Sequence, residues 1–359
     1  MVKNYRMDYL KLVDFVKEIF IKHGVNEENS LIISESLVDA DLRNVISHGV
    51  MRACNYIDRI THGGTTPNPD IKIIHETPTT ALLDGDNGLG SIVSEFAVKL
   101  AREKAEKNGI SFITVRGSSH YGAAARWAIK LSGDDMIGMT GSNTEPLICI
   151  TGGKSKGIGN NPFSCAFPTG SYGHICYDVA CSVMAGGKML AEYKLPGKNL
   201  PLGCFLDIEG NPTTDPNQAA LMMPFGGHKG YGLAVVGEMF SSILSGGNFG
   251  YGIGSQYDSL DKPSHISHYY MALKIDTLRN LQDYKNDADK FVKYLHELPK
   301  SDDTKNIYFP GELERISKED KIKNGVIVQS MVIEDLISIG KKAGLTEDSW
   351  SFLTEHPIE

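Results

Sequence analysis

Apolar residues change their spacing along this chain of 359 residues, and that change limits the folds that the chain can adopt. Over Tyr9–Phe20 they recur at helical spacing, which predicts an amphipathic helix that ends near Gly24. Asn26 is placed to cap a second helix, and Ser47–His62 has the pattern of a third. From about Ile71 onwards the spacing changes to short runs rich in β-branched and aromatic residues. The first part of the chain is therefore expected to be helical and the middle to be strand-rich.

The middle of the chain alternates strand-like runs, glycine loops and helical patterns. We predict strands at 80–83, 111–115, 136–140, 163–167 and 269–275, and helices at 92–107 and 230–244. Helical spacing returns after Pro310-Gly311. This order predicts an α+β fold in which both chain ends, residues 1–75 and 311–359, form one helical subdomain. Residues 76–310 would form a mixed-sheet α/β domain.

The composition is that of a folded protein and argues against several classes of function. Acidic and basic residues are interspersed and sum to a formal charge of −8, which argues against a nucleic-acid partner. No apolar run approaches the roughly 20 residues of a membrane helix, and the N-terminus lacks the apolar core of a signal peptide. The six cysteines form neither a CxxC pair nor a cluster with histidines. They are expected to be buried thiols in a reducing compartment, with the cytoplasm as the default.

Ser47-His48 is followed at helical spacing by Arg52 and Tyr56. On a single helix, His48, Arg52 and Tyr56 would share one face. Arginine presents a planar fork that matches a carboxylate, and histidine exchanges a proton near neutral pH. This face is a candidate site for holding a small acid and doing proton chemistry on it. The alternative is structural, with Ser47 capping the helix and Arg52 paired with Asp58 on a solvated face.

The glycine loops suggest nucleotide-binding motifs, but none of these motifs is complete. No GxG pair is followed by a third glycine at the required position, so the Rossmann fingerprint is absent. Gly152–Ser155 lacks the earlier glycine of a P-loop, and Met189 stands where a second P-loop candidate needs Ser or Thr. Neither zinc-ligand spacing nor a GxSxG motif occurs. ATP, zinc and serine-hydrolase chemistry thereby lose their main support.

Three further clusters are candidate ligand contacts. His120 follows a predicted strand and precedes small residues that open a helix, where backbone N–H groups can approach an anion. The second cluster joins Gly157–Pro162 to Tyr177–Ser182, and the third places Lys229 in a glycine-flanked loop before a helix. An exposed histidine, ordinary turns and a solvated lysine are the structural alternatives. The residues alone leave both interpretations open.

Taken in order, these segments resemble the malate/L-lactate dehydrogenase family, which also contains ureidoglycolate dehydrogenase, 2,3-diketogulonate reductase and Δ1-piperideine-2-carboxylate reductase. The resemblance covers nearly the whole chain. The matching blocks are Ala40–Arg43 with Ser47–Arg59, Gly159–Pro162 with Asp178–Ser182, Pro212–Pro216 with Gly226–Leu233, and Tyr308–Glu312. The resemblance implies hydride transfer between NAD or NADP and C2 of a small 2-hydroxy or 2-oxo acid, on a fold unlike the Rossmann fold. It also implies a homodimer, with substrate and dimer contacts on the helical subdomain and the nicotinamide cofactor on residues 76–310.

The resemblance also implies a role for each matching residue. Ser47 and His48 match a relay and proton-donor pair, Arg52 matches the residue that binds the substrate carboxylate, and Tyr56 is expected to line the substrate pocket. His120 matches the base of ureidoglycolate dehydrogenase, so the acid/base role stays open between the two histidines. The candidate cofactor-binding residues are His120, Tyr121, Gly122, Ala123, Ala124, Thr144, Asp178, Val179, Ala180, His228, Lys229, Pro310, Gly311 and Glu312. No metal is expected.

Two positions depart from the family's pattern and leave the substrate open. Asn160 stands where the family often has a threonine that contacts substrate, and Gly186 stands where some members have a larger residue. Malate/oxaloacetate or lactate/pyruvate is the preferred pair. Ureidoglycolate and a cyclic 2-imino acid are alternatives within the same chemistry. A non-catalytic nucleotide-binding protein of the same fold is the alternative from another class.

Overall fold

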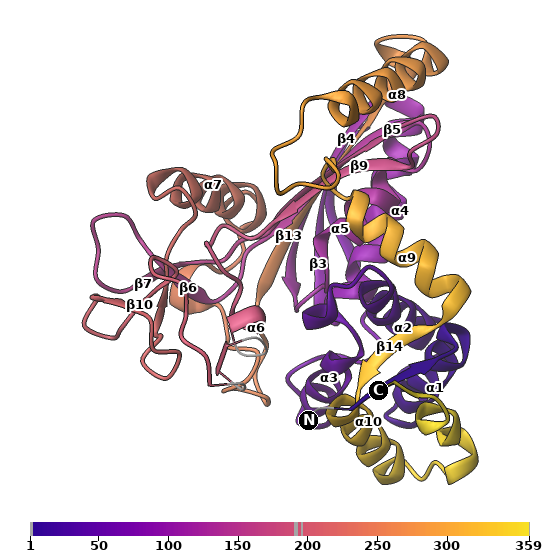
Figure 1. Ribbon diagram of the computed structural model, residues 1–359, viewed down its shortest axis with the longest axis vertical. Helices are drawn as coiled ribbons and strands as arrows, with labels where there is room; N and C mark the ends of the chain where they lie inside the picture. The colour runs from indigo at the N-terminus through magenta and orange to yellow at the C-terminus, as the bar shows by residue number, and fades with distance from the viewer. Residues whose placement is uncertain (1–2, 190–192, 195–196, 359) are drawn as a thin grey trace.

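The computed structural model describes residues 3–189, 193–194 and 197–358. These residues form a helical base that holds both chain ends, a long central sheet with helices beside it, and a smaller lobe (Figure 1). The predicted α+β class is confirmed. No helix among the described residues is long and apolar enough to cross a membrane.

The helical base joins the two ends of the chain. Its helices are α1 (Tyr9–Lys22), α2 (Glu27–Leu42), α3 (Ala53–Thr61) and α10 (Ser330–Lys342). A three-stranded sheet in the order β14 (Val326–Gln329), β1 (Asn4–Met7) and β15 (Pro357–Ile358) ties the termini together. Leu12 and Leu37 from the N-terminal helices share one apolar core with Leu336 from α10. The two chain ends pack together as predicted, while the domain boundaries near residues 75 and 311 stay a prediction.

The helix caps in the base follow from local sequence. The side chain of Asn26 accepts a hydrogen bond from the backbone N–H of Asn29 at 2.8 Å, which confirms its predicted role as the cap of α2. Asp8 caps α1 in the same way, through Lys11 N at 3.0 Å. Both caps satisfy backbone donors that a helix start leaves unpaired.

The central sheet has seven strands. In spatial order they are β2 (Lys72–Glu76), β3 (Thr80–Gly88), β4 (Ile110–Ser118), β13 (Ile266–Lys274), β5 (Met136–Ser142), β8 (Phe163–Pro168) and β9 (His174–Val179). Only β3 and β4 pair in parallel, and the other neighbours are antiparallel. The five predicted strands therefore all lie in this one mixed sheet.

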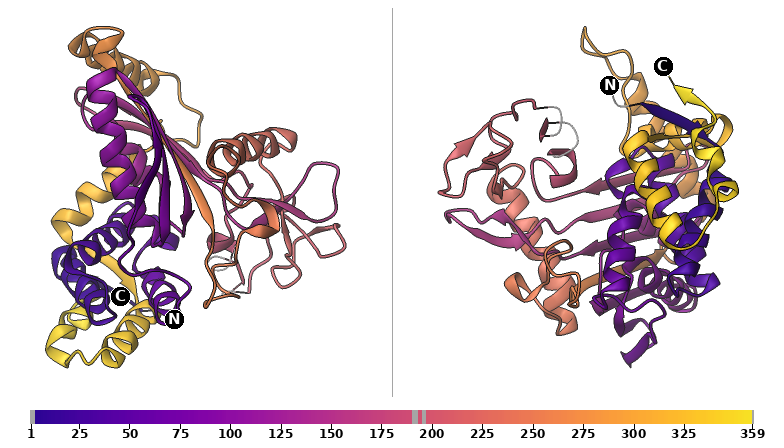
Figure 2. Two further views of the ribbon diagram at one scale, coloured as in Figure 1. Left: turned by 180° about the vertical axis from the view of Figure 1, so that it is seen from behind. Right: turned by 90° about the horizontal axis from the view of Figure 1, so that it is seen from below.

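The two faces of the sheet carry different elements. α4 (Gly90–Asn108) and α5 (Ala124–Ser132) cover one face of the sheet (Figure 2). Trp127 and Tyr270 are buried there among alanines. On the opposite face Tyr269 packs against Phe240, with ring centroids 5.4 Å apart. Residues alternate between faces along a strand. The adjacent residues Tyr269 and Tyr270 therefore pack against elements on opposite faces of the sheet. α8 (Leu281–Glu297) and α9 (Glu312–Asn324) follow β13 and lead back to the helical base.

The smaller lobe is built around a five-stranded sheet. Its order is β11 (Pro212–Thr213), β10 (Phe205–Leu206), β12 (Leu221–Met222), β6 (Pro146–Cys149) and β7 (Lys156–Gly159), accompanied by α6 (Gly186–Met189) and α7 (His228–Glu238). α7 continues into a π-helical turn, Met239–Ile243. Lys229, expected in a loop before this helix, lies instead in the first turn of α7. The helix starts earlier because the left-handed Gly226 and Gly227 supply its entry turn.

Candidate active site

The segment from Ser47 to Tyr56 is not one helix, which corrects the prediction. Ile46–His48 and Val50–Arg52 are two short 3-10 turns, and α3 begins at Ala53. The break lies at Gly49, where an added Cβ would overlap the carboxylate of Asp41. Asp41 accepts a hydrogen bond from Val50 N at 2.8 Å, so Asp41 and not Ser47 supports the start of the second turn.

Ser47 does not cap a helix, and its side chain hydrogen-bonds to the adjacent His48. Its Oγ lies 2.9 Å from Nδ1 of His48. The backbone carbonyl of Ser47 accepts a hydrogen bond from Nε of Arg52 at 2.7 Å, which orients the guanidinium toward this pair. In the described part of the chain, Arg52 forms no ion pair with a carboxylate. The result is a half-buried arginine fork available to an anion, next to a histidine.

His120 joins this group from the distant loop after β4. Its Nδ1 lies 2.6 Å from the hydroxyl of Tyr56, a residue that is almost completely buried. The rings of His48 and His120 stack, with centroids 5.3 Å apart and planes at 23°. The structure therefore brings together Ser47, His48, Arg52, Tyr56 and His120. Of the residues predicted to be catalytic or to bind substrate, only Asn160 is not joined to this group by these contacts.

Burial and charge keep both histidines neutral. Burial, helped by the positive charge of Arg52, lowers the pKa of His48 to about 4. Burial also lowers the pKa of His120 well below its ordinary value, and His48 and Arg52 act in the same direction. Burial also raises the pKa of the Tyr56 hydroxyl, so Tyr56 stays protonated. At neutral pH the site thus holds two neutral imidazoles, a phenol and one fixed cation.

A third histidine supports the His120 loop from behind. His268 on β13 is fully buried between two serine hydroxyls, with Nδ1 2.9 Å from Ser142 and Nε2 3.0 Å from Ser118. Its ring stacks on Tyr121 at a centroid distance of 4.6 Å. Tyr121, a predicted cofactor residue, is therefore buried against His268. Sequence reasoning missed His268, since a histidine within a strand carries no local signal.

Three of the predicted cofactor segments lie together. The carboxylate of Asp178 accepts a hydrogen bond from Ala125 N at 2.9 Å, which places the end of β9 at the start of α5. Cys176 N donates to the carbonyl of Pro310 at 2.9 Å. The segments 120–124, 178–180 and 310–312 therefore adjoin one another. Glu312 holds this arrangement internally, because its carboxylate accepts hydrogen bonds from His296 and from Phe309 N.

This region fits an anionic nucleotide cofactor. A Cβ at Gly311, which has φ +87°, would lie 2.8 Å from the carbonyl oxygen of Cys176, so the backbone there runs as close as glycine allows. Ala123 provides no side-chain cap to α5, and the carboxylate of Asp178 instead accepts the hydrogen bond from Ala125 N in the first turn. The buried Nε atoms of Arg126 and Arg315 have no hydrogen-bond partner among the described residues. Small residues and unpaired guanidinium donors are suitable groups for phosphates.

The remaining predicted residues belong to the smaller lobe. Asn160 N donates to Thr144 Oγ1 at 2.9 Å, and Asn160 Oδ1 accepts from Ser182 N at 2.9 Å. The neighbouring loop residues are held by a buried carboxylate that sequence reasoning missed, Glu238 on α7. It accepts hydrogen bonds from Asn143 at 3.0 Å and Asn161 at 2.8 Å. Thr144 and Asn160 are therefore positioned together.

The exposed residues His228 and Lys229 lie on α7, which is connected to the segment after β9. Ser182 forms a β-bridge with Pro224, and Phe225 N donates to the carbonyl of Cys181 at 3.0 Å. These contacts place the start of α7 beside the segment that follows Val179 and Ala180.

Gly187 brings the smaller lobe close to the Ser47–Arg52 segment. A Cβ on Gly187 would lie 3.0 Å from Ser47 Cβ and 3.8 Å from a terminal nitrogen of Arg52. A larger side chain at this position would enter the space beside the arginine fork. Gly186, the predicted departure, instead faces Met222, because its added Cβ would meet the Met222 methyl group at 2.9 Å.

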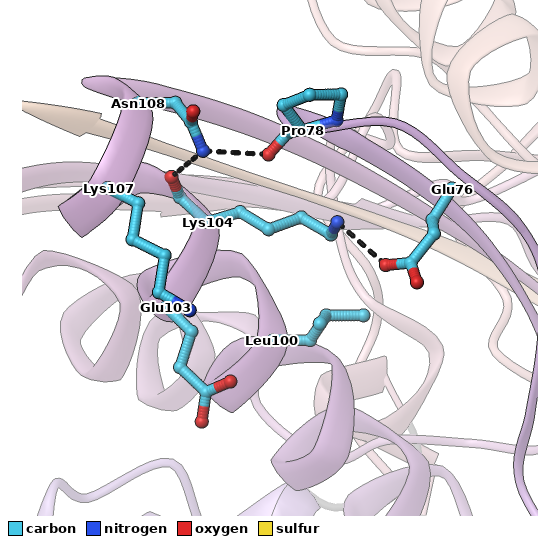
Figure 3. Close-up of a pocket in the computed structure, with 7 residues that line it drawn as sticks. All are labelled: Glu76, Pro78, Leu100, Glu103, Lys104, Lys107 and Asn108. Atoms are coloured by element: carbon cyan, nitrogen blue, oxygen red, sulfur yellow. Dashed lines mark hydrogen bonds and ion pairs between the residues drawn. The ribbon is translucent and has the colours of Figure 1, made fainter.

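A shallow surface pocket beside α4 is separate from the candidate active site. It is closed by its own polar groups, since Lys104 pairs with Glu76 at 2.8 Å and Asn108 donates to Pro78 (Figure 3). Among the described residues no group of His, Cys, Asp and Glu could hold a metal ion.

Comparison with known proteins agrees with this geometry. The family model for malate/L-lactate dehydrogenase matches residues 7–337, and the chain belongs to that family. A malate dehydrogenase from Pyrococcus horikoshii is 35% identical over 356 residues, covering 96% of this chain and 97% of the relative. An L-sulfolactate dehydrogenase from Methanocaldococcus jannaschii is 35% identical over 340 residues, covering 93% and 96%. The solved structure of malate dehydrogenase from Entamoeba histolytica superposes with a TM-score of 0.91 at 28% identity, covering 96% and 99%. The protein is thus a dehydrogenase of the hydroxy-acid class on the non-Rossmann fold of this family.

Proposed function

We propose that this protein interconverts malate and oxaloacetate with NAD or NADP. The single observation that carries this proposal is the half-buried fork of Arg52, unpaired among the described carboxylates and adjacent to two neutral histidines. The names of its relatives favour malate over lactate, because two malate dehydrogenases match almost the full chain at 35% identity.

Arg52 binds the C1 carboxylate of the substrate. Its guanidinium is always protonated and can form two parallel hydrogen bonds to a carboxylate. The bond from Nε to the carbonyl of Ser47 fixes the orientation of the fork. A bound carboxylate then has one preferred orientation, which aims C2 at the histidines. This clamp contributes mainly to the positioning of the reacting carbon.

His48 is the proton donor and acceptor at C2. Its partner, the hydroxyl of Ser47, can either accept a hydrogen bond from Nδ1–H or donate one to bare Nδ1. His48 can therefore change its protonation state without losing this partner. In reduction its Nε2–H gives a proton to the developing alkoxide, and in oxidation the neutral ring takes the hydroxyl proton. A carboxylate on Arg52 offsets the positive charge that helps to lower the pKa of His48, so substrate binding favours the protonated ring.

His120 is held in a single tautomer. Its Nδ1 faces two donors, the hydroxyl of Tyr56 at 2.6 Å and the backbone N–H of Gly122 at 3.4 Å. Nδ1 is therefore an acceptor, and the proton of the neutral ring resides on Nε2. Nε2–H can donate a hydrogen bond to the C2 oxygen and stabilise its developing charge. Tyr56 acts here as a positioning residue for His120.

A nicotinamide cofactor, when bound, supplies or accepts the hydride at C2. The residues that would hold it are the loop His120–Ala124, the segment Asp178–Ala180 and the segment Pro310–Glu312. Thr144, His228 and Lys229 are proposed as further contacts. We also propose that the protein is a cytoplasmic homodimer that acts on a small 2-hydroxy or 2-oxo acid, without a nucleic-acid or membrane partner.

A substrate panel tests the proposed function. Oxaloacetate, pyruvate, a ureide of glyoxylate and a cyclic 2-imino acid are each assayed for reduction with NADH and with NADPH. We expect the largest kcat/KM for oxaloacetate with one of the two cofactors. If kcat/KM is larger for the imine or the ureide than for oxaloacetate, that compound is the better candidate substrate. If none of the four compounds is reduced, the proposed catalytic function is contradicted.

A further inference from the structure

A strap, residues 255–262, runs from the smaller lobe to the candidate active site. It connects the 3-10 turn Gly250–Gly252 to β13. Its Tyr257 reaches the guanidinium of Arg52, because Nη1 of Arg52 hydrogen-bonds to the Tyr257 hydroxyl. The Cζ atom of Arg52 also lies 5.8 Å from the centre of the Tyr257 ring. The hydroxyl of Tyr257 thus contacts the proposed carboxylate clamp, and the aromatic ring lies within cation–π distance of it.

The strap is anchored by α3, the helix that follows Arg52. Arg59 is buried, with 1% of its surface exposed. Its guanidinium donates to the backbone carbonyls of Ser255 at 3.2 Å, Ser259 at 3.1 Å and Lys262 at 2.7 Å. Asn55 adds a hydrogen bond from Nδ2 to the carbonyl of Gln256 at 2.9 Å. Arg59 also donates to the carbonyl of Gly64 at 3.0 Å and to Thr65 Oγ1 at 3.4 Å, so it ties the strap to the segment that follows α3. The backbone that it holds in this way carries Tyr257.

We propose that Tyr257 is a further substrate-binding residue and that Arg59 positions it through the strap; this inference rests on the proposed function of Arg52. The Tyr257 oxygen accepts an N–H from Arg52, which leaves the hydroxyl hydrogen free to point at an anion on the same fork. A carboxylate bound by Arg52 then receives hydrogen bonds from both the guanidinium and the phenol. Tyr257 is 57% exposed as a residue, so its side chain has room to adjust to a bound ligand.

The chain offers a matched control for the loss of the Tyr257 hydroxyl. Tyr251 precedes the strap, is 78% exposed, and donates its hydroxyl to the carbonyl of Lys156 at 2.8 Å. Tyr257→Phe and Tyr251→Phe therefore remove the same group, but only the first removes it from the Arg52 fork. We expect Tyr257→Phe to raise KM for the acid about 10-fold with kcat nearly unchanged, as for the loss of a hydrogen bond to a charged group. Tyr251→Phe should leave both values unchanged.

The role of Arg59 is tested by non-additivity. Arg59→Lys keeps the positive charge but loses the fork that contacts three strap carbonyls. We expect Arg59→Lys to raise KM for the acid by a similar factor. In a protein that already carries Tyr257→Phe, Arg59→Lys should raise KM little further, because both changes remove the same contact. If Arg59→Lys does not fold, Asn55→Ala replaces it, since it removes only the bond to Gln256. Additive effects on KM would show that Arg59 does not act through Tyr257.

Direct binding separates this inference from the proposed function. Oxalate, a non-reacting dicarboxylate, is titrated calorimetrically into the protein with and without NADH. Weaker binding by both Arg52→Lys and Tyr257→Phe supports the clamp and the inference. Weaker binding by Arg52→Lys alone, or tighter binding by Tyr257→Phe, overturns the role of Tyr257 and leaves the clamp intact. Unchanged binding by Arg52→Lys contradicts the clamp itself.

Discussion

His48 and His120 stack with their ring centroids 5.3 Å apart, and each ring has its own hydroxyl partner. His48 bonds to the hydroxyl of Ser47, and His120 to that of Tyr56. The two hydroxyl–histidine pairs differ in one respect. The backbone N–H of Gly122 is a second donor to Nδ1 of His120, so adding a proton at this nitrogen would break hydrogen bonds. Nδ1 of His48 can be either protonated or unprotonated, because the Ser47 hydroxyl can accept or donate.

Replacing each histidine by asparagine distinguishes their roles. We expect His48→Asn to lower kcat by a factor of about 10² to 10⁴, because it removes the proton donor. His120→Asn should lower kcat less, since an amide can still donate a hydrogen bond to the C2 oxygen. The measurement is steady-state kinetics of oxaloacetate reduction, with circular dichroism to check folding. A larger loss of kcat in His120→Asn would reverse the assignment.

The pH dependence of oxidation follows from the lowered pKa of His48. In this direction the ring must be neutral, and burial together with Arg52 lowers its pKa to about 4 in the free protein. Because a lowered pKa keeps the base unprotonated in mild acid, kcat/KM for malate oxidation should stay level from pH 7 to near pH 5. It should then fall as the pH approaches 4. A fall centred near pH 6.5, the ordinary value for histidine, would rule out a buried His48 as the base.

The shape of the Arg52 side chain should matter more than its charge. Arg52→Lys keeps a cation but loses the planar fork and the Nε bond to Ser47. We expect KM for the acid to rise by about 10-fold or more, as for a lost charged hydrogen bond. Lys323→Arg, at an exposed position in the last turn of α9, is the control for an exchange of cation type. An unchanged KM in Arg52→Lys would contradict the carboxylate clamp.

His268 should make the folded protein sensitive to acid. Burial lowers its pKa to about 3, whereas an unfolded histidine titrates near 6.5, so between these pH values the unfolded chain binds more protons. The stability contributed by neutral His268 is therefore lost as the pH falls through this window, by up to about 1.4 kcal/mol per pH unit. Denaturant unfolding of His268→Gln at pH 6.5 and pH 5 should show a smaller loss than in the unchanged protein. His62→Gln, at the exposed end of α3, is the control, and equal losses in all three proteins would contradict the prediction.

Glu238 should stabilise the smaller lobe and the loops that carry Thr144 and Asn160. Glu238→Gln replaces one acceptor oxygen by an NH₂ group that faces the amide of Asn143 or Asn161. Facing donors leave buried hydrogen-bonding groups unsatisfied, so we expect a loss of about 2–4 kcal/mol in the free energy of unfolding. Glu334→Gln on the exposed face of α10 is the matched control in denaturant unfolding. A loss no greater than that of the control would show that the carboxylate is not needed.

Local sequence was sufficient for the N-terminal helices and for five strands of the central sheet, whereas strands such as β2, β6, β7 and β9 were not predicted. Helical spacing and the Asn26 cap predicted α1 and α2, and the β-rich runs predicted β3, β4, β5, β8 and β13 within a few residues. The helix expected over Ser47–His62 was wrong in its first third, because the carboxylate of Asp41 occupies the space beside Gly49. The spacing of His48 and Arg52 along the chain gives no indication that Asp41, on the preceding helix, contacts the segment between them.

By itself, the sequence determined which chemical groups this protein has and which of them are neighbours along the chain. Ser47 can pair with His48 because the two are adjacent, and Arg52 follows within two short turns. Only the tertiary structure decided that His120 bonds to Tyr56, that His268 lies behind Tyr121, and that Tyr257 reaches Arg52. These contacts join distant segments, and they form only because burying the sheet against the helical base brings those segments together. Propensity and periodicity act over a few residues, whereas the geometry of this site depends on contacts between residues far apart in the chain.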